Sequence, residues 1–567
     1  MASIDDILAH IGPWHYWTMA FVFLRGFPTA YHVMGPTFAA PKLDFFCAKP
    51  ESLGNWTTQQ WRTHGVPYVH GRRGTHDQCL MYKVEEMNGT FRVSNHEVQH
   101  CSNWEYDHSG YTHTLTDQFN LVCDRVWLRA ASQSFFMAGL MVGSFVFAHL
   151  SDWYGRKRVM VFMMPIPLIA GCVAAFSTTF LIYNIARVII AIGMGGLYNC
   201  SSTLMMECLA MKHRAIAIFL LSGGWTCGQL SLVGLAWFLR DWFYLQIAVS
   251  VAIVVNIILW FFISESPRWL LTNGKFEEGR SVLRQAMKGE KLREYLVDDV
   301  VGKYQQDYRK ETKNKKPSFI KLFSSSFLRR TSFIVMAMGI LEVLVYYNLT
   351  YSSVLLGQNP FLSFALMAGM EFPSCIAAVL LIRYVRRRLS YLVMFAMGSV
   401  FSAAVIFIPE DLWWCQLGCA ALAKFSIGTA GAVFIVQLQE IYPTQVRTLA
   451  MGLYATTSRV GAMTAPFTKE LGVLFGTWVP RAVDSSACVL LLLLGTRLPE
   501  TFNMEFVDTL QEVDLRRYVV FLRIVEGVLH ERWWYLCIFT IDMISCEPFC
   551  VVVVSFESGF LTAISPS

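Results

Sequence analysis

The feature that most constrains this chain is a series of apolar blocks, each close to the roughly twenty residues that a helix needs to cross a bilayer. Helices are the expected form, because lipid offers no partner to unpaired backbone groups. Charged residues make up only 16% of the chain, whereas soluble proteins carry about 25%, which disfavours a soluble enzyme and a disordered chain. The sequence therefore predicts an all-α membrane protein with twelve transmembrane helices, near residues 14–36, 129–150, 158–177, 179–205, 215–239, 243–263, 331–356, 362–382, 389–409, 412–438, 448–472 and 480–497.

Basic residues gather in the short connections on one side of these predicted helices. They are Arg156, Lys157, Arg158, Lys212, Arg214, Arg383, Arg386, Arg387, Arg388 and Arg447. Because an excess of Lys and Arg marks cytoplasmic connections, this side and both termini are predicted to lie in the cytoplasm. The net charge of +6 is spread over these connections, so no nucleic-acid surface is expected. We predict a multi-pass protein of the plasma membrane.

The long connection at residues 41–127 is predicted to face outward. It contains two acceptor sequons for N-linked glycans, at Asn55 and Asn88, and such acceptors lie on the outer side of a membrane. An even number of cysteines allows two disulfides in an oxidising compartment, and three pairings stay open. The four cysteines are Cys47, Cys79, Cys101 and Cys123.

Three features recur along the chain at an offset of about 232 residues. A Glu followed seven positions later by an Arg occurs at Glu207 and again at Glu440. A charged segment follows the second predicted span at 152–158 and the eighth at 383–388, and an acidic motif closes the sixth and the twelfth spans. One shared offset predicts two six-helix pseudo-repeats.

This repeat predicts the domain organisation. The N-terminus and first span occupy 1–40, the outer loop 41–127, and the remainder of the first half 128–267. A cytoplasmic linker at 268–330 leads to the second half at 331–500, and a cytoplasmic or interfacial tail fills 501–567. Within the linker, Phe276–Lys288 is predicted to form an amphipathic helix on the membrane surface. Within the tail, 533–556 is apolar but interrupted, and a thirteenth span stays an alternative.

Parallel six-span repeats are the layout of the major facilitator fold, whose substrate site lies between the halves. The segment 148–158 resembles the signature of that superfamily between spans two and three. The segments 265–271 and 442–447, with the cysteine-bearing outer loop, resemble the organic cation, carnitine and organic anion transporters, over roughly residues 10–505. The resemblance implies transport of small organic ions by alternating access, without a cofactor.

Charged residues at the cytoplasmic helix ends are predicted to form gating ion pairs between the halves. Partly solvated pairs of this kind contribute about 1 kcal/mol each, so they can break in every cycle. The alternative is that they only fix topology and bind lipid head groups. In the second half, Arg383 and Arg386 replace the Asp and Gly usual in the family, which predicts a weaker gate there. The predicted gating residues are Asp152, Arg156, Arg158, Glu207, Arg214, Glu440 and Arg447.

Ionisable residues inside the predicted spans mark a candidate substrate site, because each is costly unless paired or hydrated. By the resemblance, Glu371 matches an acidic residue of the cation and carnitine members, and Arg459 matches an Arg of the carnitine and anion members. Lys424 matches a lysine widespread in the family. A site with both signs of charge suits a carnitine-like or betaine-like zwitterion, and a purely structural ion pair is the alternative role of Arg459.

Aromatic residues supply the rest of the predicted site. Trp225, Tyr346, Tyr347 and Tyr351 are candidates to hold a quaternary ammonium by cation–π attraction, or else to pack between helices. Arg187 is expected to be structural, whereas the roles of Arg25 and Glu342 stay open.

The predicted function is plasma-membrane transport of small organic cations or zwitterions. An organic anion exchanger is the alternative within the class, and a non-transporting membrane sensor is the alternative outside it. A coupling ion, sodium or proton, stays open. No spacing of nucleophile, base, metal ligands or nucleotide loop rises above chance, so neither an enzyme nor a metal site is predicted.

Overall fold

The protein is described from a computed structural model. The structure describes residues 4–502, apart from 42, 51–52, 54–55, 68–76, 88–89, 211–212, 288–293, 312–322, 324 and 477. Both predicted glycan acceptors, Asn55 and Asn88, and the apolar segment 533–556 lie outside the described residues, as does the side chain of Arg214.

The twelve predicted spans are confirmed as helical segments, some of them broken in two. In the first half these are α2 (Pro13–Met34), α6 (Trp127–Tyr154), α7 (Arg156–Met163) with α8 (Pro165–Ala175), α9 (Phe180–Cys208), α10 (Arg214–Phe238), and α11 (Trp242–Val251) with α12 (Ile253–Trp260). In the second half they are α16 (Ser326–Ser352), α17 (Pro360–Gly369) with α18 (Glu371–Tyr384), α19 (Arg387–Phe407), α20 (Trp413–Ile441), α21 (Thr444–Phe475) and α22 (Trp478–Gly495).

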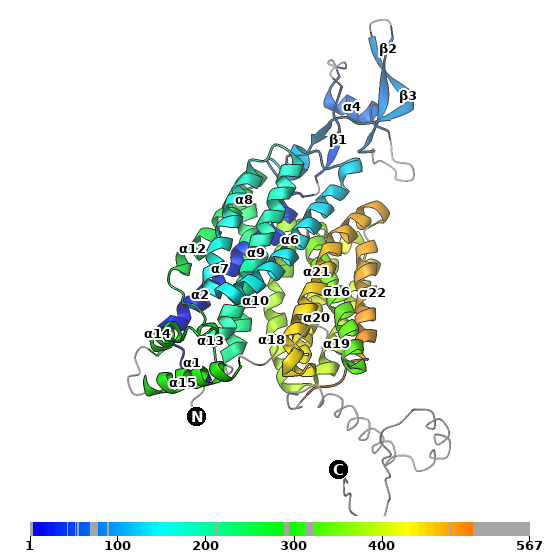
Figure 1. Cartoon of the computed structure of the whole chain (residues 1–567). Coiled ribbons are helices and arrows are strands. Elements are labelled where there is room, and N and C mark those ends of the chain that lie inside the picture. The colour runs from blue at the N-terminus through cyan, green and yellow to red at the C-terminus, as the bar shows by residue number, and fades with distance from the viewer. Residues whose placement is uncertain are drawn as a thin grey trace, which may run out of the picture. The chain divides into compact units, whose positions relative to one another are not determined.

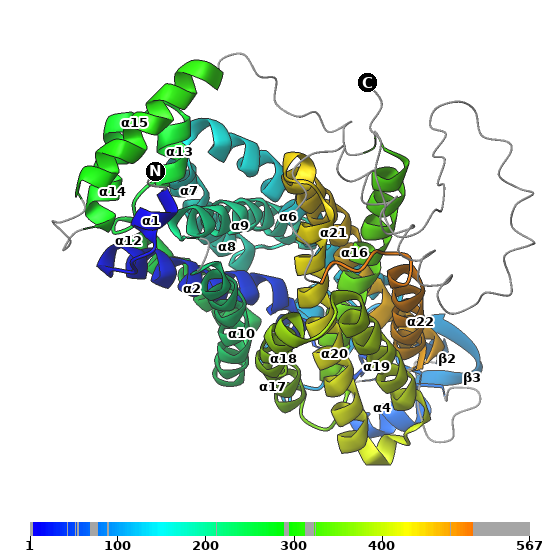
Figure 2. The same cartoon turned by 90° about the horizontal axis from the view of Figure 1, so that it is seen from below.

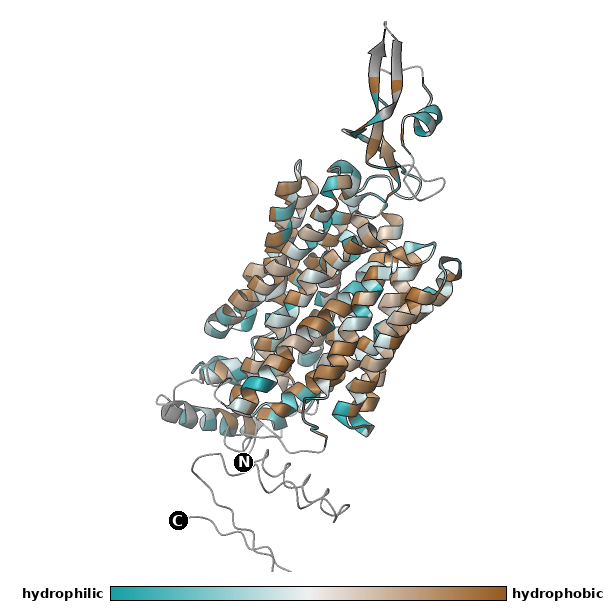
Figure 3. Cartoon of the chain, turned by 90° about the vertical axis from the view of Figure 1, so that its right-hand side faces the viewer, coloured by the Kyte–Doolittle hydropathy of each residue, from teal (hydrophilic) through white to brown (hydrophobic). Residues whose placement is uncertain are grey.

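Ten of these segments are long and apolar enough to cross a membrane, within the described part of the chain. The two that complete the twelve, α2 and α21, each carry an arginine near the middle, Arg25 and Arg459. Large apolar side chains are exposed on the outside of the bundles, including Phe238 and Phe407, each 83% exposed. Figure 3 shows apolar residues along the helices and polar residues near their ends. Such a surface is suited to lipid rather than to water.

The transmembrane helices form two bundles that correspond to the two halves of the sequence (Figures 1 and 2). The bundles meet where α6 packs on α21 and where α10 packs on α17 and α18. Glycine allows close helix contact within each bundle: a Cβ atom at Gly143 would clash with the Ile192 carbonyl, and one at Gly461 with the Ile340 carbonyl.

The outer loop is a small subdomain of two antiparallel strand pairs. Strand β1 (Phe45–Cys47) pairs with β4 (Trp104–Tyr106), and β2 (Leu80–Met87) pairs with β3 (Thr90–His100). A short helix α4 (Thr58–His64) places the fully buried Trp61 in a small core, where its indole donates to the Cys47 carbonyl at 2.9 Å. The structure selects one disulfide pairing of the three: Cys47–Cys101 and Cys79–Cys123.

The cytoplasmic linker forms three helices, α13 (Pro267–Thr272), α14 (Phe276–Ala286) and α15 (Glu294–Glu311). The predicted amphipathic helix is therefore present as α14, and its place on the membrane surface stays a prediction. Its apolar residues Leu283 and Ala286 are buried against α15 and against the N-terminal helix α1 (Ile4–Leu8). Other parts of the chain thus cover these two residues, whereas Phe276 and Met287 at the ends of the helix are only partly buried.

Candidate functional site

A cavity of about 330 Å³ lies between the two halves. Its walls come from α2, α6, α9 and α10 of the first half and from α16, α18, α20 and α21 of the second. Five of the six predicted substrate residues line it: Trp225, Tyr346, Tyr347, Glu371 and Arg459. The sixth, Lys424, is 1% exposed and lies behind the wall, where it reaches Glu371.

Glu371 is placed at the cavity by the break between α17 and α18. Pro373 lies two residues further on, and a proline is tolerated in the first turn of a helix but not in its interior. The chain therefore starts a new helix at Glu371, whose carboxylate extends into the cavity wall.

Both halves contribute hydrogen bonds to the Glu371 carboxylate. From α10 of the first half, Thr226 Oγ1 donates at 3.0 Å and Gln229 Nε2 donates at 3.1 Å. From α16 of the second half, the Tyr346 hydroxyl donates a short hydrogen bond. Lys424 Nζ of α20 lies 3.5 Å from Oε1. A carboxylate with this set of donors is held in one orientation.

Lys424 is the cation that compensates Glu371. Its Nζ donates to Thr350 Oγ1 at 2.5 Å and lies 3.1 Å from the centre of the Tyr346 ring. Removing either member of such a buried pair leaves an uncompensated charge. We therefore regard Lys424 as a residue that positions Glu371 and Tyr346, rather than as a contact for cargo.

Aromatic side chains form a continuous surface beside Glu371. Trp225 Nε1 donates to the Tyr346 hydroxyl at 3.1 Å, and the rings of Tyr346 and Tyr347 meet edge to face at 5.3 Å. Tyr351 stacks on Tyr347 at 5.6 Å but lines a different pocket nearer the outer loop. The cavity therefore includes three of the four candidate aromatics.

The other ionisable residues that the sequence analysis named within the spans divide into cavity residues and structural residues. Arg459 lines the cavity and interacts with the Tyr347 hydroxyl, and Arg25 lines the opposite wall. Arg187 is structural as expected, since it donates to the His32 carbonyl and to Gln133 Oε1, both at 2.8 Å. Glu342 is buried away from the lining and accepts from the Tyr454 hydroxyl at 2.8 Å.

Sequence reasoning missed Thr226, Gln229 and Tyr198. The first two lie three residues apart on one face of α10, one turn beyond the cavity residue Ser222. Polar side chains repeated at helical spacing within an apolar span were the available signal. Tyr198 of α9 lines the cavity beneath Arg25, and a lone tyrosine in a span carries no such signal.

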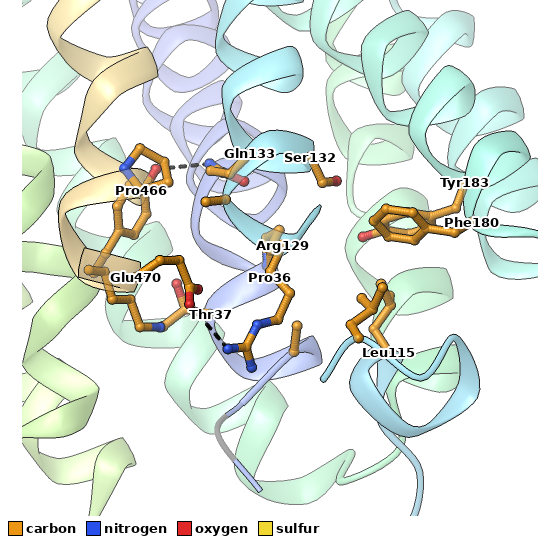
Figure 4. A pocket seen from close by; sticks show the side chains of 15 residues that line it. Pro36, Thr37, Leu115, Arg129, Ser132, Gln133, Phe180, Tyr183, Pro466 and Glu470 are labelled. Carbon is orange, nitrogen blue, oxygen red and sulfur yellow. Dashed lines mark hydrogen bonds and ion pairs between the residues drawn. The ribbon is translucent and has the colours of Figure 1, made fainter. Parts of the chain in front are cut away.

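Near the outer loop, a small pocket of about 70 Å³ lies where α6 meets α21 (Figure 4). Three polar contacts join the halves here. Arg129 Nη2 lies 3.4 Å from Glu470 Oε2, Gln133 Nε2 donates to the Tyr351 hydroxyl at 2.8 Å, and Ser134 Oγ donates to the carbonyl of Met463 at 2.6 Å. These contacts hold the outer ends of the halves together.

At the cytoplasmic end, the predicted gating charges of the first half form one cluster. Arg156 lies 2.8 Å from Asp152 and 3.0 Å from Glu207, and Glu265 accepts the Arg156 backbone N–H at 3.0 Å. The turn before Arg156 needs a glycine, because Gly155 has φ +109°. All of these partners belong to the first half.

The second half repeats this cluster with fewer acidic partners. Arg387 lies 3.3 Å from Glu440, and Glu500 accepts the Arg388 backbone N–H at 3.1 Å. Position 383, which corresponds to Asp152, is an exposed arginine. In this structure the charge pairs of each half therefore lie within that half. That these residues bridge the two halves in another conformation stays a prediction.

Two further predicted gating residues bind other partners. Arg158 lies 3.4 Å from Glu278 of α14, which ties the first half to the linker. Arg447 Nε donates to the Tyr442 carbonyl at 3.3 Å.

Comparison with known proteins shows which proteins this chain is similar to. A family model described as "Sugar (and other) transporter" matches residues 81–509. The Organic cation transporter protein of Drosophila melanogaster is 28% identical over 522 residues, which cover 90% of this chain and 94% of that protein. Human Organic cation/carnitine transporter 2 is 26% identical over 554 residues, covering 94% and 96%. These relatives confirm the resemblance drawn from the sequence.

Solved structures of the xylose transporter XylE from E. coli share the fold. The partially occluded inward-open form has a TM-score of 0.58 and 14% sequence identity, covering 87% of this chain and 100% of that chain. XylE bound to 6-bromo-6-deoxy-D-glucose, described as a major facilitator superfamily symporter, has a TM-score of 0.56 and 16% identity, covering 88% and 98%. The major facilitator fold predicted from the internal repeat is confirmed.

Proposed function

The chain belongs to the sugar (and other) transporter family, and from that premise we propose that it carries small organic cations or zwitterions across the plasma membrane by alternating access. Cargo binds in the cavity between the halves and leaves on the other side after the halves move. Relatives named as organic cation and organic cation/carnitine transporters support this class of cargo.

The observation that carries the proposal is the position of Glu371. Its carboxylate lies in a cavity between two bundles and accepts hydrogen bonds from both. A charged group at such a boundary responds to cargo and to movement of the halves alike. A non-transporting sensor has no need for a central charge shared between two mobile bundles.

The chemistry of the lining supports a zwitterion such as carnitine. Glu371 and the faces of Trp225 and Tyr346 suit a quaternary ammonium, because negative charge and aromatic faces both attract cations. Arg459 suits a carboxylate, because its planar guanidinium can donate two parallel hydrogen bonds. A single small solute can satisfy both sides only if it carries both charges.

The outer contacts support alternating access. Arg129, Gln133 and Ser134 join the halves beyond the cavity, and each bond is weak enough to break in a transport cycle. We infer that their release opens the cavity outward, while residues of the cytoplasmic clusters Arg156–Glu207 and Arg387–Glu440 form contacts between the halves on the inner side.

Uptake of radiolabelled carnitine, tetraethylammonium and 4-aminohippurate into cells expressing the protein tests this function, with sodium and proton gradients set separately. We expect saturable, concentrative uptake of at least one solute, with loss of uptake in Glu371→Gln at equal surface expression. No uptake of any of these solutes under any gradient would favour the sensor, and uptake of 4-aminohippurate alone would favour an anion exchanger.

A further inference from the structure

The cavity contains a buried arginine with no acidic partner among the residues that the structure describes. Arg25 of α2 is 1% exposed, and its guanidinium lies 4.5 Å from the centre of the Tyr198 ring. Its Nε atom has no hydrogen-bond partner, and no ion pair joins Arg25 to a carboxylate of the described residues. An arginine in this position is costly unless something else supplies negative charge.

Its neighbours in the first half do not supply that charge. The ring stacked on the guanidinium is that of Tyr198, and the uncharged Thr29, one turn further along α2, also lines the cavity. A structural arginine in the same half has a different environment: Arg187 donates to a backbone carbonyl and to a glutamine. Arg25 thus differs from a packing arginine, and it opens onto the cavity that binds cargo.

The charge balance around the cavity points the same way. Arg25 and Arg459 line it from opposite halves, and neither forms an ion pair within the described residues. Glu371, the acidic residue of the lining, is already compensated by Lys424 at 3.5 Å. The lining and its immediate support therefore hold three positive charges and one negative charge. A purely cationic cargo would add to this excess, whereas an anionic group would reduce it.

We propose that Arg25 and Arg459 form a carboxylate-binding side of the cavity, so that the solutes this protein carries must bear a carboxylate. The proposal rests on the proposed function and changes its cargo: zwitterions stay, purely cationic solutes are excluded, and carboxylates without a cationic group are admitted. Tyr198 holds the Arg25 guanidinium by cation–π attraction. Because Arg25 belongs to the first half and Arg459 to the second, a bound carboxylate links the two halves.

Pairs of solutes that differ only in the carboxylate test this proposal. The probes are carnitine with its methyl ester and 4-aminohippurate with its methyl ester. Uptake per surface molecule is measured for the wild type, Arg25→Gln and Arg25→Lys. The matched control is Arg240→Gln, since Arg240 also stacks on an aromatic ring, Trp237 at 5.0 Å, but is exposed and outside the cavity.

We expect the wild type to take up the acid of at least one pair in preference to its ester. Arg25→Gln should lower kcat/KM for that acid by about tenfold or more, because a buried charge partner is removed, and change ester uptake by less than about twofold. Arg25→Lys should retain part of the preference, and Arg240→Gln should resemble the wild type.

Wild-type preference for the esters overturns the proposal, and so does an equal loss for acid and ester in Arg25→Gln, which indicates a structural role. In both cases uptake persists, so the proposed function stands. If no probe is taken up, the proposed function fails, and thermal unfolding of the purified protein decides the inference. Stabilisation by the acid but not by its ester, absent in Arg25→Gln, supports a carboxylate site, whereas no stabilisation by either acid refutes it.

Discussion

Arg129 of α6 and Glu470 of α21 form an ion pair between the two halves, with Nη2 of the arginine 3.4 Å from Oε2 of the glutamate. Both side chains are mostly buried, at 16% and 11% exposed. Gln133, whose Nε2 donates to the Tyr351 hydroxyl at 2.8 Å, lines the same pocket as this pair (Figure 4). Water therefore screens it less than it screens an exposed pair, and it stabilises the state with the outer ends together.

Weakening this ion pair should open the outer side more often. The reporter is Ser132→Cys, because Ser132 lines the outer pocket. In this reporter, Glu470→Gln should raise the rate of labelling by a membrane-impermeant thiol reagent about fivefold, because the lost ion pair contributes about 1 kcal/mol to the outward-closed state. The same change without the reporter gives the background from native cysteines. The reversed pair, Arg129→Glu with Glu470→Arg, should bring the rate back toward the parent, and unaltered labelling in Glu470→Gln would count against an outer latch.

Separating Glu371 from Lys424 should destabilise the second half. The change Lys424→Met leaves a carboxylate in a largely buried site, and we expect the free energy of unfolding to fall by about 3 kcal/mol. The double change Glu371→Gln with Lys424→Met removes both charges and should recover much of that loss without recovering transport. Thermal unfolding of the detergent-purified protein and uptake measure the two effects. Equal stability of the single and double variants would show that the two residues do not interact.

The two cytoplasmic clusters should contribute unequally to the stability of the folded protein. Arg156 has two acidic side-chain partners at 3.0 Å or less, whereas Arg387 has one, Glu440 at 3.3 Å. We expect Arg156→Gln to lower the free energy of unfolding by about 1 kcal/mol more than Arg387→Gln does. Thermal unfolding of both purified variants checks this difference.

Introducing an acidic residue at position 383 should stabilise the cytoplasmic cluster of the second half. Arg383→Asp recreates with Arg387 the spacing between Asp152 and Arg156, and such an i,i+4 pair should raise the free energy of unfolding by about 0.5 kcal/mol, measured by thermal unfolding. This increase should vanish when Arg387→Gln is added, because the new carboxylate then lacks its arginine. A gain that survives this second change would have another origin.

Loss of either disulfide should impair the outer loop. The bridges close sequence separations of 54 and 44 residues, and removing a bridge of this kind typically costs about 2–5 kcal/mol. Cys47→Ser and Cys79→Ser should each lower surface expression. Peptide mapping of the unreduced protein should yield the pairs Cys47–Cys101 and Cys79–Cys123, and any other pairing would contradict the fold of the loop.

The helices were predictable because lipid imposes a length and a composition on every span, and this signal is carried by each block alone. The two halves were predictable from the internal repeat, because the equivalence of Glu207 and Glu440 can be found in the sequence alone, without a structure. The structure places both in equivalent ion pairs, with Arg156 and Arg387.

Spatial relationships between distant segments were not predictable in the same way. The cysteine pairing depends on the strand register of the outer loop, which four positions in a sequence cannot specify. The apolar face of α14 indicated burial but not its partner, and the structure shows α1 and α15 packed against Leu283 and Ala286. The direction of Arg25 was likewise undetermined, because a residue near the middle of a span can face protein, lipid or cavity.

The hydrogen bonds of Glu371 have a consequence for the kinetics of transport. The residue belongs to the second half, yet two of its donors, Thr226 and Gln229, belong to the first. Any motion that draws α10 away from α18 must break both bonds, and the positive charge of an ammonium group beside the carboxylate can compensate for their loss. An empty carrier has no such replacement, so it should reorient more slowly than a loaded one, and solute waiting on the far side should speed the movement of solute from the near side.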